Sequence, residues 1–447
     1  MVSEGFLKTI KKSLDEGKIS IDVVDNAVRL ILNAKYDLGL FHDPYKYCDE
    51  NRAKTEIFTN SNRSEARKIA AQSLVLLKND NQLLPLKKSG TIALIGPLAD
   101  AKENMAGTWS VATKQENSIS LLAGIKSAVG ASAKVLYAKG SNLDYDPALE
   151  EKGTMFGKTL HRDNRTKEEL LAEALKIANQ SDVILAALGE SAELSGECSS
   201  RTNIEIPQAQ KDLLEELVKT GKPVVLVLFN GRPLVLKREK EIVPAILDVW
   251  FAGSEAGYAI ADVLFGNENP SGKLTTTFPR SIGQVPIYYA SKNTGRPLGN
   301  TNGKFEKFKS NYIDERNEPL FPFGYGLSYT KFEYSNLKIS TSKINFNETM
   351  EVSVDVINTG NYDGKEVVQL YIRDLVGSVT RPLKELKGFQ KITIKKGEKQ
   401  KVTFRISQED LKFYNSDLQF IAEPGEFEVF VGGDSDTQFN EKFLLMN

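Results

Sequence analysis

The chain has 447 residues, 40% of them apolar and 26% charged, so it is long enough for two or three globular domains with a substantial core. Its 58 Lys and Arg against 59 Asp and Glu leave a net charge of -1. The chain therefore lacks the excess of positive charge with which proteins bind nucleic acid or an anionic membrane. No apolar stretch is as long as a transmembrane helix, and we expect no membrane partner.

Residues suited to metals and cofactors are scarce. The two cysteines, Cys48 and Cys198, are too few for a disulfide framework, and the two histidines, His42 and His161, lie in no metal-binding pattern. Neither GxGxxG nor the P-loop motif follows an expected strand, which argues against nucleotide binding. We therefore expect free thiols, no metal and no cofactor.

Residues 4–36 have the pattern of two amphipathic helices. Gly17 breaks the first helix, and Ser20 is placed to cap the second. No strand accompanies these helices, so we expect residues 1–60 to be the last part of a larger domain. The segment after Met1 has neither the basic nor the apolar region of a signal peptide, which leaves two interpretations: a cytoplasmic protein, or an internal Met of a longer polypeptide.

From residue 61 to residue 290, helical and strand-like segments alternate. A helix is expected over Ser64–Lys78, and Thr166 with Glu169 forms the capping box of another. Strands that alternate with helices of this length favour βαβ units, that is, an α/β sandwich with a mostly parallel sheet. The apolar runs that we expect to form its strands are Thr91–Gly96, Lys134–Ala138, Asp182–Leu188, Pro223–Phe229 and Ala245–Trp250.

The last third of the chain has a different pattern. Residues 280–330 are rich in Gly, Pro, Asn and Tyr and lack periodicity, and we assign residues 291–331 to a linker arm. Over residues 332–447 the apolar period becomes two, as in Val352, Val354 and Val356. This pattern is typical of an antiparallel β-sandwich of the immunoglobulin or fibronectin type III kind. The other alternating sets are Val368, Leu370 and Ile372; Val402, Phe404 and Ile406; and Phe427, Val429 and Val431.

One loop is rich in side chains that can do chemistry. Residues Gly189–Arg201 come directly after the expected strand Asp182–Leu188 and include Glu190, Glu193 and Glu197. In an open parallel sheet, ligands gather beyond the carboxyl ends of the strands. Two interpretations stay open from the residues alone: an acidic loop that only faces water, and a catalytic loop that contributes a carboxyl group.

A longer string in this loop carries a family resemblance. It reads Gly189-Glu-x(6)-Glu-x-Ser-Ser-Arg-Thr-x-Ile-x-Ile-Pro, and it resembles the acid/base loop of glycoside hydrolase family 3, in the branch of bacterial periplasmic β-glucosidases. Other segments resemble the same family in chain order, so that the resemblance covers nearly the whole chain. They are Ala34-Lys-Tyr-Asp-Leu-Gly-Leu-Phe, Ser73-Leu-Val-Leu-Leu-Lys-Asn, Leu83-Leu-Pro-Leu, Ile95-Gly-Pro-Leu-Ala-Asp, Phe229-Asn-Gly-Arg-Pro-Leu, Trp250-Phe-Ala-Gly, Asn269-Pro-Ser-Gly-Lys-Leu, Phe321-Pro-Phe-Gly-Tyr-Gly-Leu-Ser-Tyr, Asn358-Thr-Gly and Lys384-Glu-Leu-Lys-Gly-Phe.

The resemblance implies a (β/α)8 barrel, an α/β sandwich and a fibronectin type III-like β-sandwich, with only the last helices of the barrel in this chain. It also implies retaining hydrolysis of a β-linked glucoside or oligosaccharide. Retention needs two carboxyl groups about 5–5.5 Å apart, one a nucleophile and the other an acid that later acts as a base. Glu197 falls on the acid/base position. Glu190 is the alternative, although it follows the strand directly and is placed close to the sheet.

Two further side chains are candidates beside Glu197. Arg201 is placed to orient or tune Glu197, or instead to form a structural salt bridge within the loop. Trp109 falls where family members often place an aromatic residue near the leaving group, where it would stack on a sugar face. Its other interpretation is a half-buried core tryptophan.

The family's nucleophile segment has no match in this chain. Asp22, Asp25, Asp37 and Asp43 lie outside the required Ser/Thr-Asp-Trp/His-Gly context. We therefore expect the chain to be the C-terminal portion of a β-glucosidase and to be inactive alone. The competing hypothesis is a non-catalytic sugar-binding or scaffolding half that pairs with a separate barrel chain. A full-length family member of this branch would be periplasmic.

Overall fold

The computed structural model describes residues 4–110, 112–152, 161–298 and 304–446, and the chain divides into two compact units, Met1–Arg63 and Ser64–Asn447. The first unit contains the helices α1 (Gly5–Asp15), α2 (Ile21–Asp37) and α3 (Arg52–Glu56). The two helices expected over residues 4–36 are thus confirmed, and neither α1 nor α2 buries a residue. Among the described residues, no helix is long and apolar enough to cross a membrane.

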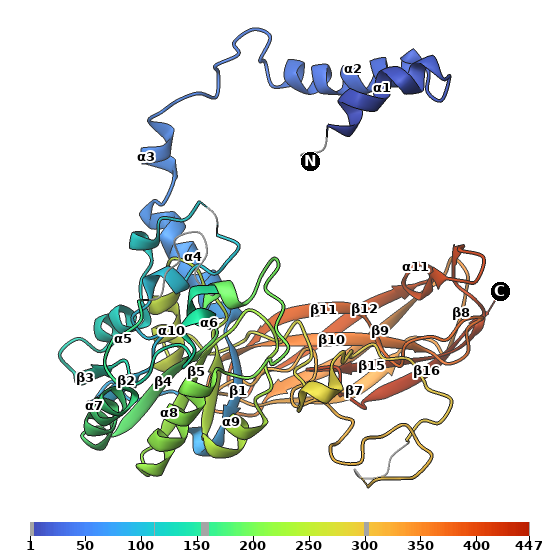
Figure 1. Ribbon diagram of the computed structural model, residues 1–447. Helices are drawn as coiled ribbons and strands as arrows, with labels where there is room; N and C mark the ends of the chain where they lie inside the picture. The colour runs from blue at the N-terminus through green and yellow to red at the C-terminus, as the bar shows by residue number, and fades with distance from the viewer. Residues whose placement is uncertain (1–3, 111, 153–160, 299–303, 447) are drawn as a thin grey trace. The chain divides into compact units, whose positions relative to one another are not determined.

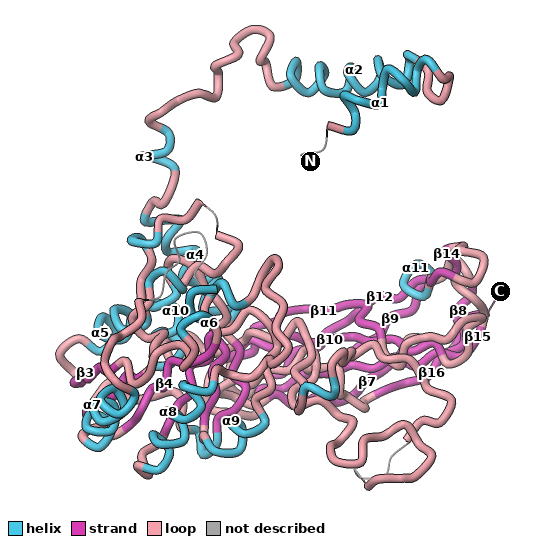
Figure 2. The backbone as a smooth tube through the Cα atoms, in the orientation of Figure 1, coloured by secondary structure: helices cyan, strands magenta, loops and turns pink. Residues whose placement is uncertain are grey.

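A six-stranded sheet forms the first half of the second unit (Figures 1 and 2). Its order is β1-β6-β5-β4-β2-β3, and all pairs are parallel except β1 with β6. The predicted α/β sandwich with a mostly parallel sheet is therefore confirmed. The strands are β1 (Val75–Asn79), β2 (Gly90–Ile95), β3 (Ala133–Ala138), β4 (Val183–Gly189), β5 (Val224–Phe229) and β6 (Ala245–Asp248).

Helices cover both faces of this sheet, which explains why its central strands are continuously apolar. One core contains side chains of α4, α5 and α10, and the core on the opposite face contains those of α7 and α8. The helices of the sandwich are α4 (Asn60–Ser73), α5 (Leu121–Val129), α6 (Pro147–Lys152), α7 (Lys167–Asn179), α8 (Gln208–Lys219), α9 (Lys237–Ile242) and α10 (Ala256–Leu264), with short 3-10 helices at Asp80–Gln82, Lys102–Asn104, Gln115–Asn117, Ala192–Leu194 and Ile282–Gln284.

The helix expected over Ser64–Lys78 is wrong in its last part. Helix α4 ends at Ser73, and Val75–Asn79 forms the antiparallel edge strand β1. A short apolar run fits a buried strand and a buried helix equally well by periodicity. Pairing with β6 decides the outcome here, because that pairing buries the side chains of Leu76 and Leu77 almost completely.

The sheet reverses its winding at β2, which lies between β3 and β4. This position is a topological switch point, where the loops after neighbouring strands part and leave room for a ligand. Gly96 directly follows β2 at φ +140, and Gly189 is the last residue of β4 at φ +134. A Cβ atom on Gly189 would lie 1.9 Å from Phe229 O, so only glycine allows the backbone to leave the sheet there.

The end of the chain forms the expected β-sandwich. A five-stranded sheet, β11-β10-β15-β16-β8, packs on a three-stranded sheet, β12-β9-β7. The alternating residues of the predicted strands, including Val352, Val354 and Val356, are buried in one core. The strands are β7 (Phe332–Ile339), β8 (Lys343–Asn345), β9 (Thr349–Asn358), β10 (Gly364–Asp374), β11 (Glu385–Ile394), β12 (Lys399–Ser407), β13 (Phe413–Tyr414), β14 (Phe420–Ile421), β15 (Gly425–Gly432) and β16 (Asn440–Met446), with helix α11 (Gln408–Leu411).

The segment assigned to a linker arm contributes to the core of the second unit. Its described residues form no helix or regular strand, yet Leu320, Phe321 and Tyr329 are buried. Ion pairs also join the two halves of the unit: Lys273 Nζ lies 3.0 Å from Glu366 Oε1, and Lys365 Nζ lies 2.7 Å from Glu268 Oε1. The α/β sandwich and the β-sandwich therefore form one body.

Candidate active site

The loop after β4 is closed by an ion pair between its two ends. Glu190 begins the loop, and Arg201 Nη1 donates to Glu190 Oε1 at 2.6 Å. A second nitrogen, Arg201 Nη2, donates to Glu205 O at 3.2 Å, beyond the end of the loop. These contacts fix the base of the loop against the sheet.

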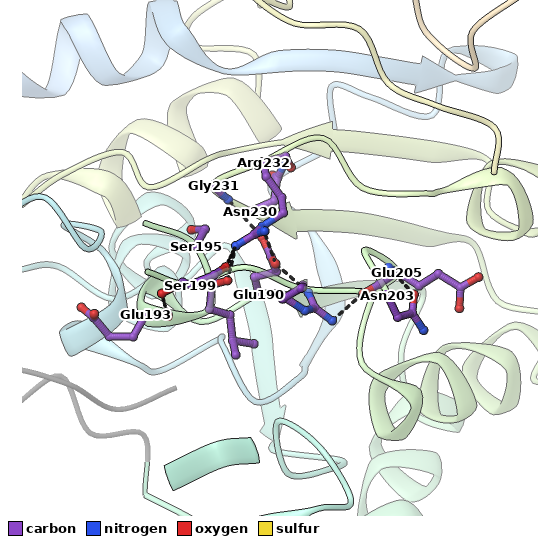
Figure 3. Close-up of polar contacts among 12 residues, drawn as sticks. Glu190, Glu193, Ser195, Ser199, Asn203, Glu205, Asn230, Gly231 and Arg232 are labelled. Atoms are coloured by element: carbon purple, nitrogen blue, oxygen red, sulfur yellow. Dashed lines mark hydrogen bonds and ion pairs between the residues drawn. The ribbon is translucent and has the colours of Figure 1, made fainter. Parts of the chain in front are cut away.

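A second arginine, Arg232, lies in the turn after β5 and contacts both Glu190 and the backbone of the loop (Figure 3). Its Nε lies 3.2 Å from Glu190 Oε1. Its Nη2 donates to Ser199 O at 2.6 Å and also to Leu194 O. Leu194 and Ser199 lie on either side of Glu197 in the sequence. One guanidinium group therefore holds both arms of the turn that carries Glu197.

Glu190 lies at the centre of this cluster and has no exposed surface. Burial raises the pKa of its carboxyl group, and the hydrogen bond from Arg201 and the charge of Arg232 oppose the shift. Gly231 N also donates to Glu190 Oε2, at 3.4 Å. In this arrangement Glu190 is a structural anchor for the loop and is closed to a substrate.

Glu197 has the opposite environment, because its side chain is exposed. Its carboxylate forms neither a hydrogen bond nor an ion pair with any of the described residues. Its neighbours have unusual backbone angles, Gly196 at φ +138 and Cys198 at φ +60. The guanidinium group of Arg201 binds Glu190, which agrees with the interpretation of Arg201 as a structural salt bridge within the loop. A role of Arg201 in tuning Glu197 stays a prediction.

Trp109 extends from the loop after β2, on the other side of the switch point. Its side chain is 73% exposed, so the interpretation as a half-buried core tryptophan is wrong. Its neighbour Thr108 touches the Glu197 loop: Thr108 Oγ1 donates to Glu193 Oε2 at 3.1 Å, and a Cβ atom on Gly196 would lie 2.6 Å from Thr108 Cγ2. The positions next to Trp109 and Glu197 thus pack together, which places both residues at the carboxyl edge of the sheet.

Similarity to known proteins identifies the family and its domain types. Residues 74–329, more than half of the 447-residue chain, match the glycosyl hydrolase family 3 C-terminal domain. The chain belongs to glycosyl hydrolase family 3. Residues 366–435 match the fibronectin type III-like domain, which is the sandwich of this family 3 chain and confirms the second expected domain type.

Relatives of the family 3 chain include proteins with names and solved structures. It is 48% identical to a periplasmic β-glucosidase of Salmonella typhimurium over 100% of this chain and 58% of that protein, and 39% identical to a β-xylosidase of Formosa agariphila over 95% and 56%. The crystal structure of a β-glucosidase from Listeria innocua in complex with isofagomine matches with a TM-score of 0.87 at 38% identity, over 100% of this chain and 58% of that chain. The chain thus spans less than two thirds of the length of these relatives.

Sequence reasoning did not single out several residues that lie at or near the candidate site of this family 3 chain. Arg232 lies in the string Phe229-Asn-Gly-Arg-Pro-Leu, directly after a parallel strand, and its position next to the Glu197 loop follows from the strand order β5-β4. Asn104 Oδ1 accepts a hydrogen bond from Ala192 N at 2.7 Å and joins the loops after β2 and β4. Asp248, at the end of β6, is completely buried, and burial raises its pKa well above the usual range.

Proposed function

We propose that this chain is the part of a retaining β-glucosidase that carries the general acid/base, and that Glu197 is that residue. The observation that carries the proposal is the contrast between the two candidate carboxyl groups. Glu197 is exposed at the tip of a braced loop at the carboxyl edge of the sheet, whereas Glu190 is buried between two arginines. The named β-glucosidases among the relatives support a β-linked glucoside as the substrate.

In the proposed mechanism, Glu197 first donates its proton to the oxygen of the glycosidic bond as that bond breaks. A carboxylate nucleophile attacks the anomeric carbon at the same time and forms a covalent glycosyl ester. Glu197, now a carboxylate, then accepts a proton from the water that cleaves the ester, which restores both groups. Trp109 would stack on the sugar of the leaving group from the opposite side of the switch point.

The nucleophile is the part of this mechanism that we do not find in the 447 residues. We propose that it belongs to a barrel domain, supplied by a longer polypeptide or by a separate chain, and that the 447-residue chain is inactive alone. The exposure of helices α1 and α2 supports the proposal of a further barrel domain, because neither helix buries a residue. The name of the Salmonella relative supports a periplasmic location for the assembled protein.

An activity assay on an aryl β-glucoside tests this proposal. The purified chain is expected to give no turnover, and a fusion to the part of the Salmonella enzyme that this chain does not match is expected to restore it. In that fusion, Glu197→Ala should lose activity and regain it with azide, which attacks the glycosyl ester without base catalysis. Turnover by the 447-residue chain alone would contradict the missing nucleophile, and full activity of Glu197→Ala would contradict the role of Glu197.

A separate barrel chain is the second candidate arrangement, in which this polypeptide serves as a scaffolding half. Mixing the purified chain with a separately expressed barrel domain distinguishes the two. Activity that appears on mixing, at protein concentrations that allow a stable complex, supports the split enzyme. Activity only in the covalent fusion supports one continuous polypeptide.

A further inference from the structure

A groove of about 750 Å³ lies between the linker arm and the β-sandwich, and its lining includes no residue of the loops that carry Glu197 and Trp109. One wall is formed by residues between Pro286 and Leu298 and between Ser310 and Pro319, which belong to the linker arm and to the few residues directly before it, and the other includes Leu383 and Ser435 of the sandwich. Figures 1 and 2 show this arm as an irregular loop that leaves the 3-10 helix at Ile282–Gln284.

The floor of the groove is held in place by packing and hydrogen bonds. Tyr289 stacks on Phe323 with ring centroids 4.3 Å apart and meets the edge of Tyr371 at 6.0 Å. Leu383 N donates to Ser291 O at 2.8 Å, which attaches the arm to the sandwich. The groove is therefore a built feature of the second unit and does not depend on a bound ligand.

The lining combines exposed aromatic rings with unpaired polar groups. Tyr288 is 66% exposed and Tyr312 is 41% exposed, and they come from the two different segments of the first wall. Within the described residues, neither phenol hydroxyl forms a hydrogen bond, and neither does the side-chain amide of Asn293. These groups are available to a ligand that offers both an apolar face and hydroxyl groups.

The charge of the lining narrows the class of ligand. Lys292 and Asp436 are the two charged residues among those that line the groove, and their charges cancel. A phosphate, a nucleic acid or a strongly charged peptide would find no complementary field there. A second depression, of about 330 Å³, shares Asn311 and Tyr312 with the groove but is lined by charged side chains of both signs, Lys304, Asp314, Glu315, Arg316 and Glu318. The neutral lining is therefore a property of the groove itself, and the proposed site is confined to it.

We propose that this arm groove binds a neutral oligosaccharide, as a site separate from the acid/base loop. The rings of Tyr288 and Tyr312 stack on the apolar faces of successive sugar units, and Asn293 with the two phenol hydroxyls bonds to sugar hydroxyl groups. The site needs no catalytic residue. It would hold a longer substrate or a polysaccharide near the enzyme and raise the local concentration of chain ends.

Calorimetric titration of the complete 447-residue chain with cellotetraose and with laminaribiose tests the proposal, because it requires no activity. We expect saturable binding of at least one sugar, a Kd at least about tenfold weaker in Tyr288→Ala and in Tyr312→Ala, and an unchanged Kd in Glu197→Gln. The matched control is Tyr414→Ala, since Tyr414 is also exposed (64%) but lies on β13 and does not line the groove.

Three outcomes would overturn the proposal. The first is no heat of binding with either sugar at millimolar concentration. The second is binding that survives both arm substitutions but is lost in Glu197→Gln, which would place the sugar at the acid/base loop. The third is that the chain binds no sugar but self-associates in sedimentation, and that Tyr288→Ala abolishes this self-association. The exposed rings would then form an interface between copies of the chain. If the arm groove binds no sugar but the fusion to the unmatched part of the Salmonella enzyme is active, the proposal for the groove fails and the proposed function stands.

Discussion

Arg201 and Glu190 stand at opposite ends of one loop and are joined by a hydrogen bond of 2.6 Å. Arg232 binds the same carboxylate from the neighbouring strand's turn, at 3.2 Å. Two guanidinium groups thus share one completely buried carboxylate, while the loop between the ion-paired residues exposes Glu197. The buried ion pairs restrict the position of the exposed Glu197, because fixing the two ends of a loop limits the conformations of its tip.

Removal of the Glu190 carboxylate should destabilise the protein strongly. Glu190→Ala would leave two arginines without their buried partner, and such a loss costs about 3–5 kcal/mol. Glu190→Gln keeps the shape and should cost less. Urea denaturation measures both, with Glu216→Gln as the control, since Glu216 pairs with Lys219 at the surface and loss of that ion pair should change stability little. Equal midpoints for Glu190→Ala and the control would refute the anchoring role.

Replacement of Arg232 by lysine should loosen the Glu197 turn more than it destabilises the fold. A lysine retains the charge near Glu190, but its single ammonium group cannot bind Leu194 O, Ser199 O and the carboxylate together. Hydrogen exchange of the amides between residues 194 and 199 should become at least about tenfold faster, which corresponds to about 1.4 kcal/mol of local stability.

The matched control for this substitution is Arg238→Lys, because Arg238 forms a single exposed ion pair with Glu215 at 2.9 Å. That variant should leave exchange in the loop unchanged, and strands β4 and β5 should keep their protection in both variants. Faster exchange throughout the sheet of Arg232→Lys would mean that Arg232 supports the fold as a whole rather than the turn.

Much of this architecture is predictable from the sequence because it rests on local patterns. The apolar runs Val183–Gly189 and Val224–Phe229 are strands because parallel strands are covered on both faces, and the period of two marks the sandwich. The edge strand Val75–Asn79 was missed because its run is too short for periodicity to distinguish strand from helix. Tertiary pairing with β6 supplies the missing information.

The site was predictable only in part, for a similar reason. The position of Glu197 after a parallel strand is a local feature, whereas the partner of Arg201 is decided by the path of the loop. The sequence permitted Arg201 to reach Glu197 or to pair within the loop, and the fold brings it to Glu190. Arg232 is 42 positions from Glu190 by residue number and adjacent to it only because β5 lies beside β4. Contacts of this kind follow from sheet order.

Gly196→Ala should destabilise the loop by both steric overlap and backbone strain. A control glycine separates the two causes. Gly196 has φ +138, and a Cβ atom there would lie 2.6 Å from Thr108 Cγ2. We expect a cost of about 2–4 kcal/mol, the sum of backbone strain and overpacking. Gly221→Ala is the control, because Gly221 has φ +73 with open space around its Cα, and its cost should be about 1 kcal/mol from backbone strain alone. Equal losses of stability for Gly196→Ala and Gly221→Ala in thermal denaturation would mean that the Thr108 side chain moves aside without an energetic cost.

Asp248→Asn should stabilise the protein at neutral pH and change the pH dependence of its stability. The carboxyl group is completely buried, Trp250 N donates to its Oδ1 at 3.1 Å, and its Oδ2 has no hydrogen-bond partner. Burial raises the pKa of Asp248 well above its usual 3.8, a shift that the hydrogen bond from Trp250 N and the polar side chain of Asn230 offset only in part. The folded state therefore binds a proton that the unfolded state releases once the pH exceeds about 4.

The sign of the effect follows from this difference. Because the folded state holds more protons, the contribution of Asp248 to the free energy of unfolding is largest below the unfolded pKa and falls as the pH rises toward the folded pKa. Asparagine keeps the acceptor for Trp250 N and carries no charge, so the stability of Asp248→Asn relative to the natural chain should rise between pH 4 and pH 7. Urea denaturation across this range measures the difference, with the exposed Asp417→Asn as control. A difference that does not grow with pH would show that Asp248 is not held protonated by its burial.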